Sequence, residues 1–158
     1  VLGFSMTDLI LVYICVQLSA LAGAALWAKP TDTKGPKFVV IVTLVQWIAV
    51  VTMIYFVESK TMFFVVAALA GTGLGAVQSA SRAFMSSLIP KGREGEFFGF
   101  YSLCGKGAAI LGPLLFGEIA GATGDLRLAA LSVLVFFVAG ALVVWRIKAV
   151  GPTAIKPT

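Results

Sequence analysis

The sequence contains no histidine and only two cysteines, and only 12% of its 158 residues are charged. Both cysteines, Cys15 and Cys104, lie in apolar stretches, where a disulfide framework is not expected. Without histidine, and without cysteines at ligand spacing, the chain lacks the side chains that build transition-metal sites. It also has no Walker A motif that would indicate direct use of ATP. We therefore expect neither a metal centre nor a cofactor.

Apolar residues are abundant instead. They make up 59% of the chain, and the mean hydropathy is +1.02, far above that of a soluble domain. A helix of about 20 residues crosses the hydrocarbon core of a bilayer, which is about 30 Å thick. We predict an all-α membrane protein with one helix bundle over residues 1–150 and a disordered cytoplasmic tail over residues 151–158. The predicted spans are residues 8–28, 38–57, 61–88, 97–122 and 127–146.

Basic residues alternate between the two ends of these spans. Short cytoplasmic loops are rich in Lys and Arg, so the side with eight basic residues is predicted to be cytoplasmic, together with the C-terminus. The net charge of +5 is therefore explained by the distribution of basic residues between the two sides of the membrane. We expect the lipid bilayer as a partner and no nucleic acid. The eight are Lys29, Lys34, Lys37, Lys91, Arg93, Arg146, Lys148 and Lys156, and the opposite side has Lys60 and Arg127.

Connections and glycines predict how the spans meet. The prolines and glycine of residues 28–37 predict a tight cytoplasmic turn, and residues 58–61 are too few for anything but an antiparallel hairpin. The stretch G-T-G-L-G at residues 71–75, and Gly117 with Gly121, are small faces that let helix backbones approach closely. An odd number of spans, an outside N-terminus and a first residue that is valine indicate a fragment.

Two cations lie inside the apolar stretches. A Lys or Arg near the middle of a membrane helix costs roughly 2.5–3.5 kcal/mol, so each is expected to face a protein interior or a watery cavity. Lys106, near mid-depth, is predicted either to bind an anionic group in a cavity or to form a lock with an acid on absent helices. Arg82, nearer the cytoplasmic end, either clamps loop acids or helix C-termini or contacts a solute.

Several motifs point to one family. They are Q-S-A-S-R at residues 78–82, L-I-P-K-G-R-E-G-E-F-F-G-F-Y at 88–101, G-K at 105–106, G-P-L-L-F-G at 112–117 and T-G-D-L-R at 123–127. Together they resemble the vacuole-effluxer family of the major facilitator superfamily, which contains a vacuolar amino-acid exporter and bacterial relatives. The resemblance implies helices eight to twelve of a twelve-helix transporter, with helices one to seven missing. It implies a plasma or inner membrane, or a vacuolar membrane in a eukaryote.

The resemblance also implies where a site would lie. The first, third and fourth spans would face a central cavity, with Gln17, Gln78, Tyr101, Ser102 and Glu118 as further cavity candidates beside the two cations. The two amides could instead bond neighbouring helices, Tyr101 could close the cytoplasmic mouth, and Glu118 could pair with a nearby cation. Gln46, on a peripheral span, is expected to serve packing. The pattern Asp32-x-x-Gly35-x-Lys37 resembles the loop that braces helix ends between conformations in this superfamily.

These observations favour a secondary transporter that moves a small solute by alternating access, and the family resemblance implies amino-acid efflux. The alternative is a non-transporting membrane scaffold or assembly subunit, which would not need cations inside its spans. An intramembrane enzyme is not expected, because the chain lacks histidine, an acid dyad and a nucleophile–base pair.

Overall fold

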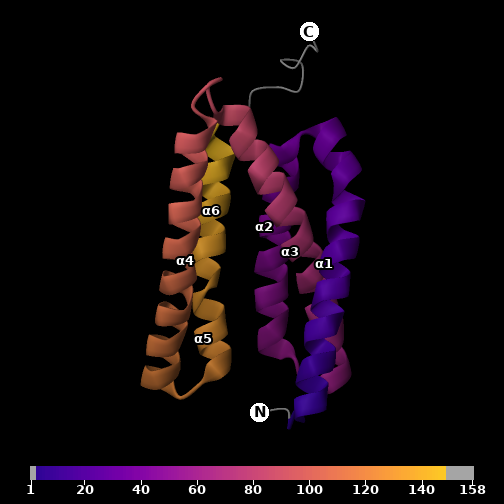
Figure 1. Cartoon of the computed structure of the whole chain (residues 1–158). Helices are drawn as coiled ribbons and strands as arrows, with labels where there is room; N and C mark the ends of the chain where they lie inside the picture. Colours follow the sequence, from indigo (N-terminus) through magenta and orange to yellow (C-terminus); the bar gives the residue numbers. More distant parts are fainter. Residues whose placement is uncertain (1–2, 149–158) are drawn as a thin grey trace.

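The chain folds into long helices that run back and forth side by side, as Figure 1 shows for the computed structural model, which describes residues 3–148. Five helical spans within these residues are long and apolar enough to cross a membrane, which confirms an all-α integral membrane protein. The predicted tail, residues 151–158, lies outside the described residues. The helices are α1 (Met6–Lys34), α2 (Pro36–Phe56), α3 (Lys60–Leu88), α4 (Glu94–Thr123), α5 (Leu126–Ser132) and α6 (Leu134–Arg146).

The first connection differs from its prediction. Residues 28–37 do not form a turn of that length, because α1 continues through Pro30 to Lys34 and places Asp32 in its last turn. Pro30 has no N–H to donate to the Leu26 carbonyl, so the helix continues there with one backbone hydrogen bond fewer. The Thr31 hydroxyl donates to the next carbonyl, that of Trp27 (2.6 Å). The chain reverses at Gly35 alone, whose φ of +88° suits glycine, and Pro36 starts α2 with a φ that fits the first helical position.

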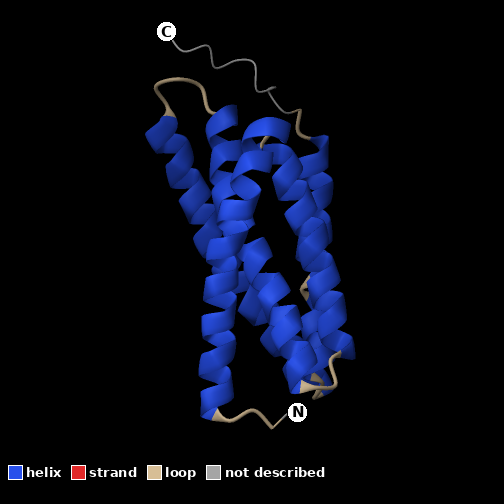
Figure 2. Ribbon diagram, turned by 90° about the vertical axis from the view of Figure 1, so that its right-hand side faces the viewer, coloured by secondary structure: helices blue, strands red, loops and turns tan. Residues whose placement is uncertain are grey.

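The other connections are as short as predicted, but the last span is not one helix. Figure 2 shows the remaining turns as brief loops at the two ends of the bundle. Ser59 caps α3, and Gly124, in the left-handed conformation, ends α4. The fifth span breaks at Val133, whose N–H bonds the Ala130 carbonyl (3.2 Å) in a tighter i→i+3 turn. This break divides the span into α5 and α6.

α1 and α3 run parallel and approach each other more closely than side chains with a β-carbon would allow. A β-carbon added to Gly71 would lie 2.5 Å from the Val16 carbonyl oxygen, and one added to Gly75 would overlap the Ala20 carbonyl. Gly23 of α1 meets the Thr72 backbone in the same way. The glycines predicted to serve packing therefore do so in α3, and we call this contact the glycine seam.

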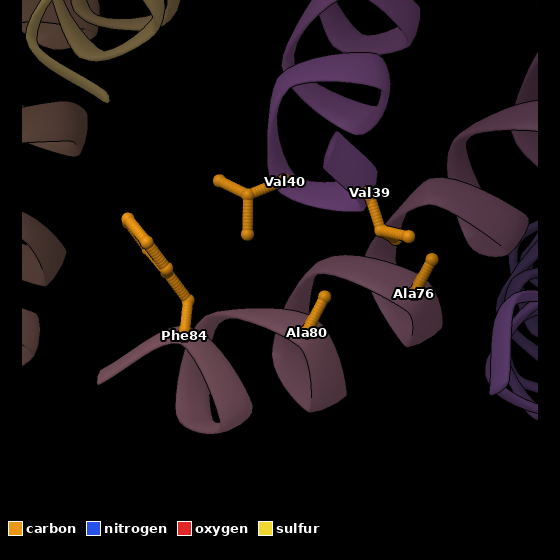
Figure 3. Packing of buried hydrophobic residues seen from close by; sticks show 5 residues of the cluster. All are labelled: Val39, Val40, Ala76, Ala80 and Phe84. Atoms are coloured by element: carbon orange, nitrogen blue, oxygen red, sulfur yellow. The ribbon is translucent and has the colours of Figure 1, made fainter. Parts of the chain in front are cut away.

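α2 packs on another face of α3 through small and β-branched side chains. Figure 3 shows Val39 and Val40 of α2 facing Ala76, Ala80 and Phe84 of α3. All five side chains are buried, and alanine at two of the α3 positions lets the valines sit close to the α3 backbone. A second cluster, of Val50, Val57 and Val66, continues this contact toward the other end of the bundle.

α4 is the least packed helix. It lies beside α5 in Figure 1, and none of its residues is buried among the described residues. A β-carbon added to Gly105, Gly107, Gly117 or Gly121 would meet no atom of another helix in residues 3–148 within 4 Å. The predicted packing face at Gly117 and Gly121 thus has no partner within the part of the chain that the structure describes.

The same substitution, glycine to alanine, can be compared at a glycine of the seam and at a glycine of the unpacked α4. Gly75→Ala should destabilise the fold by about 1–3 kcal/mol, because the new methyl group collides with backbone that cannot move without separating α1 from α3. Gly105→Ala should leave stability unchanged or raise it by up to about 1 kcal/mol, because alanine is the better helix former and space is open there. Thermal unfolding of the two variants in detergent measures the difference. Equal melting temperatures would contradict a glycine seam.

The orientation in the membrane stays a prediction with its own test. The ends of α1, α3 and α6 and the starts of α2 and α4 share one end of the bundle, and seven of the eight basic residues predicted to be cytoplasmic lie there, within residues 3–148. We call it the basic end. In a background without Cys15 and Cys104, a cysteine at Gly92 should resist an impermeant thiol reagent in intact cells, whereas one at Ser59 should be labelled. The reverse pattern would invert the topology.

Candidate functional site

Three of the residues predicted to line a cavity lie around one groove between α1 and α3. The groove has a volume of about 380 Å³ and is open on one side. It lies beside the glycine seam, and its floor is formed by small residues that leave room for it. The residues that carry its chemistry and its apolar wall are Gln17, Ala20, Leu74, Gln78, Ser79 and Arg82.

The polar groups of this groove are not consumed by the fold. The side chains of Gln17, Gln78 and Arg82 are exposed, and none of them forms a side-chain hydrogen bond or an ion pair with another residue in 3–148. Ser79 donates to carbonyls of its own helix, at Ala76 (3.1 Å) and Gly75 (3.4 Å), so its oxygen can still accept a bond. The groove therefore offers one cation, two amides and one hydroxyl acceptor to a ligand.

Gln46 shows what a structural amide looks like in the same bundle. Its Nε2 donates to the Leu69 carbonyl (2.7 Å) and to the Thr72 hydroxyl (2.8 Å), which joins α2 to α3. This matches the packing role expected for a glutamine on a peripheral span. Gln17 lies at a similar level and Gln78 about two turns further along α3, and neither forms such bonds within residues 3–148. The difference between the amides therefore comes from their neighbours and not from their type.

The candidates on α4 do not reach the groove. Lys106, Ser102 and Glu118 are exposed on α4, and the described residues offer none of them an ion pair or a side-chain hydrogen bond. Tyr101 is different, because its hydroxyl lies 2.9 Å from the Ser81 hydroxyl and ties α4 to α3 on the half of the bundle toward the basic end. The two embedded cations therefore do not form one cluster within this chain.

Two other cations brace helix ends. The Lys37 ammonium, at the start of α2, donates to the Trp145 carbonyl (2.9 Å) and the Ile147 carbonyl (2.5 Å) where α6 ends. The Arg127 guanidinium, at the start of α5, donates to the Tyr55 carbonyl (2.9 Å) and the Val57 carbonyl (2.8 Å) where α2 ends. α2 is thus fastened to α6 at one end and to α5 at the other. At each end a cation binds carbonyls that have no hydrogen-bond partner in their own helix.

Of the switch-loop candidates, only Lys37 makes a contact of this kind. Asp32 is exposed and its side chain has no hydrogen-bond or ion-pair partner in residues 3–148, and Gly35 is the buried turn itself. Arg127 was counted from the sequence only as a charge and a motif residue. One feature of the sequence could have indicated its bracing role. Arg127, like Lys37, lies in the first turn of a helix, where the helix dipole disfavours a cation unless another group binds it.

Known proteins with similar sequences define the family. The profile of the vacuole effluxer Atg22-like family matches residues 1–150. The chain belongs to this family. It is 32% identical over 142 residues to the uncharacterized MFS-type transporter YxiO of Bacillus subtilis (strain 168). The matched region is 90% of this chain and 33% of that protein. It is 32% identical over 144 residues to autophagy-related protein 22 of Pichia angusta, covering 84% and 26%.

A third relative matches a shorter region more closely. Autophagy-related protein 22 of Kluyveromyces lactis is 41% identical over 68 residues, 43% of this chain and 14% of that protein. The chain thus spans a third or less of the length of these relatives. No solved structure is significantly similar to it. Membership of the vacuole effluxer Atg22-like family confirms the resemblance inferred from the motifs.

In this Atg22-like chain, the end-capping cations should contribute to stability separately. Lys37→Met and Arg127→Met should each destabilise the fold by about 1–2 kcal/mol, because each leaves C-terminal carbonyls without a charged donor. The two sites lie at opposite ends of α2, so the effects should add in the double variant. Lys91→Met, an exposed lysine in a loop at the basic end, is the control and should change little. Melting temperatures in detergent measure all four variants, and a loss no larger than that of Lys91→Met would refute the bracing role.

Proposed function

We propose that this chain forms the C-terminal helices of a secondary transporter of the major facilitator superfamily. The observation that carries the proposal is the groove between α1 and α3, where Gln17, Gln78 and Arg82 meet inside membrane-spanning helices without partners in residues 3–148. Polar groups at membrane depth are costly and are kept where they serve a pathway or a site. The family membership supports the same function.

The unequal packing of the helices supports alternating access. α2 with α5 and α6 is held at both ends by Lys37 and Arg127, as expected for peripheral helices that move as one body. α4 instead exposes Lys106 in the middle of a span. A cation there requires a protein or water environment, which further helices of the complete transporter would provide. Rocking of two such halves about a central site is the mechanism that we propose.

The proposed solute class rests on the family. We propose efflux of a small solute, with amino acids as the first class to test, because relatives matched over most of this chain are vacuole effluxer-like proteins. We also propose that the bundle occupies residues 1–150 with its C-terminus in the cytoplasm. The full-length transporter, purified and reconstituted in proteoliposomes, tests this by counterflow with a panel of labelled amino acids. Absence of saturable, stereoselective uptake for every member would contradict amino-acid transport.

Lys106 tests the pathway directly. If its ammonium binds an anionic group of the solute, Lys106→Ala in the full-length transporter should abolish transport and leave the melting temperature nearly unchanged. Lys106→Arg should keep only part of the activity, because a planar guanidinium does not replace a compact ammonium. Transport rate and melting temperature are measured together for each variant.

A structural lock predicts the opposite pair of results. If Lys106 holds an acid on another helix, its removal leaves that acid buried without a partner and destabilises the fold by roughly 3–5 kcal/mol. A large fall in melting temperature that is rescued by neutralising one acid would assign Lys106 to the scaffold. Unchanged transport by a stable Lys106→Ala would remove it from both roles.

A further inference from the structure

The groove between α1 and α3 is electrostatically one-sided. Arg82 is the only charged residue among those that line it, and neither Asp nor Glu is among them. Its other polar groups, on Gln17, Gln78 and Ser79, are neutral. A ligand group that neutralises Arg82 is therefore favoured here, whereas a cationic group would meet a like charge and no carboxylate among the lining residues.

Arg82 is also free to bind. Three other cations in the described part of the chain already have partners on another helix. Lys37 and Arg127 bind helix-end carbonyls, and Lys60 pairs with Asp8 at 2.7 Å. The guanidinium of Arg82 has no acid or carbonyl partner within residues 3–148. Its planar set of five N–H donors can bind a carboxylate or a phosphate through two parallel hydrogen bonds.

The order of residues along the groove sets the shape of the ligand. Gln78 lies one helical turn before Arg82 on α3, about 6 Å along the axis, so both side chains can reach one carboxylate. Gln17 lies near the level of Gly71, because Val16 of α1 contacts that residue. This puts Gln17 roughly 10 Å from Gln78 along the bundle axis. Ala20 and Leu74 form an apolar wall between the two amides.

We propose, on the basis of the transporter function above, that this groove binds the carboxylate end of the solute. Arg82 anchors the carboxylate, Gln78 donates a further hydrogen bond to it, and the aliphatic body of the solute lies along Ala20 and Leu74. The groove holds no partner for an ammonium group. A simple carboxylate should therefore bind this groove at least as well as the matching zwitterion.

Four probes with one carbon skeleton separate these charges. They are 4-methylpentanoate (an anion), leucine (a zwitterion), 4-methylpentanamide (neutral) and leucinamide (a cation). Their affinities for the full-length transporter in lipid nanodiscs are measured by calorimetric titration. The anion should bind about 10- to 100-fold more tightly than the neutral amide, which is the factor expected from charge-assisted hydrogen bonds, and the cation should bind most weakly.

Variants assign this selectivity to one side chain. Arg82→Gln should bind anion and neutral amide equally, and Arg82→Lys should keep part of the preference, because it retains the charge without the planar fork. Arg146→Gln removes the same charge from the exposed C-terminal end of α6 and should bind all four probes as the unchanged protein does. Because each comparison is made between probes within one variant, a general loss of stability cannot imitate the result.

The outcomes separate this proposal from the transporter function. No preference for the carboxylates, no binding of any of the four probes, or a preference that survives Arg82→Gln would overturn the groove assignment. If amino acids are still transported in proteoliposomes, the transporter function stands without it. Conversely, Arg82-dependent carboxylate binding without transport of any solute would support the groove and refute the transporter.

Discussion

The close contact between α1 and α3 is the constraint on which the rest of the bundle depends. Lipid chains are as apolar as leucine, so membrane helices associate through packing and not through a hydrophobic driving force between them. Gly71 and Gly75 allow the two backbones to touch, and α2 then packs against a different face of α3 through Val39 and Ala76. The polar groove exists beside this seam because small residues bring the helices together without filling the space next to them.

Charges divide into those that hold the bundle and those that the bundle leaves open. Lys37 and Arg127 occupy helix starts, where their own helix dipole disfavours them, and they bind the carbonyls at the end of a neighbouring antiparallel helix. Arg82 and Lys106 lie within their spans and have no such partners in residues 3–148. The same residue types are thus engaged or left without a partner according to whether a helix end is within reach.

Span positions could be predicted from the sequence because length and apolarity are local properties. Within 3–148, each of the five predicted spans corresponds to helix, although α1 extends through Pro30 to Lys34 and the last span breaks at Val133. A proline inside a helix removes one backbone hydrogen bond and does not by itself decide where the helix ends. The break at Val133 occurs without proline or glycine at that position. Composition alone encodes neither.

The sequence by itself determined the membrane class, the family and the list of polar residues at membrane depth, since each depends only on residue type, order and spacing. Only the tertiary structure decided how those residues group. Gln17 and Gln78, 61 positions apart in the chain, meet Arg82 in one groove, while Gln46 is bonded to α3 and Lys106 stays apart on α4. Which helices touch depends on backbone approach at a few glycines, and that approach requires both partners to be in place.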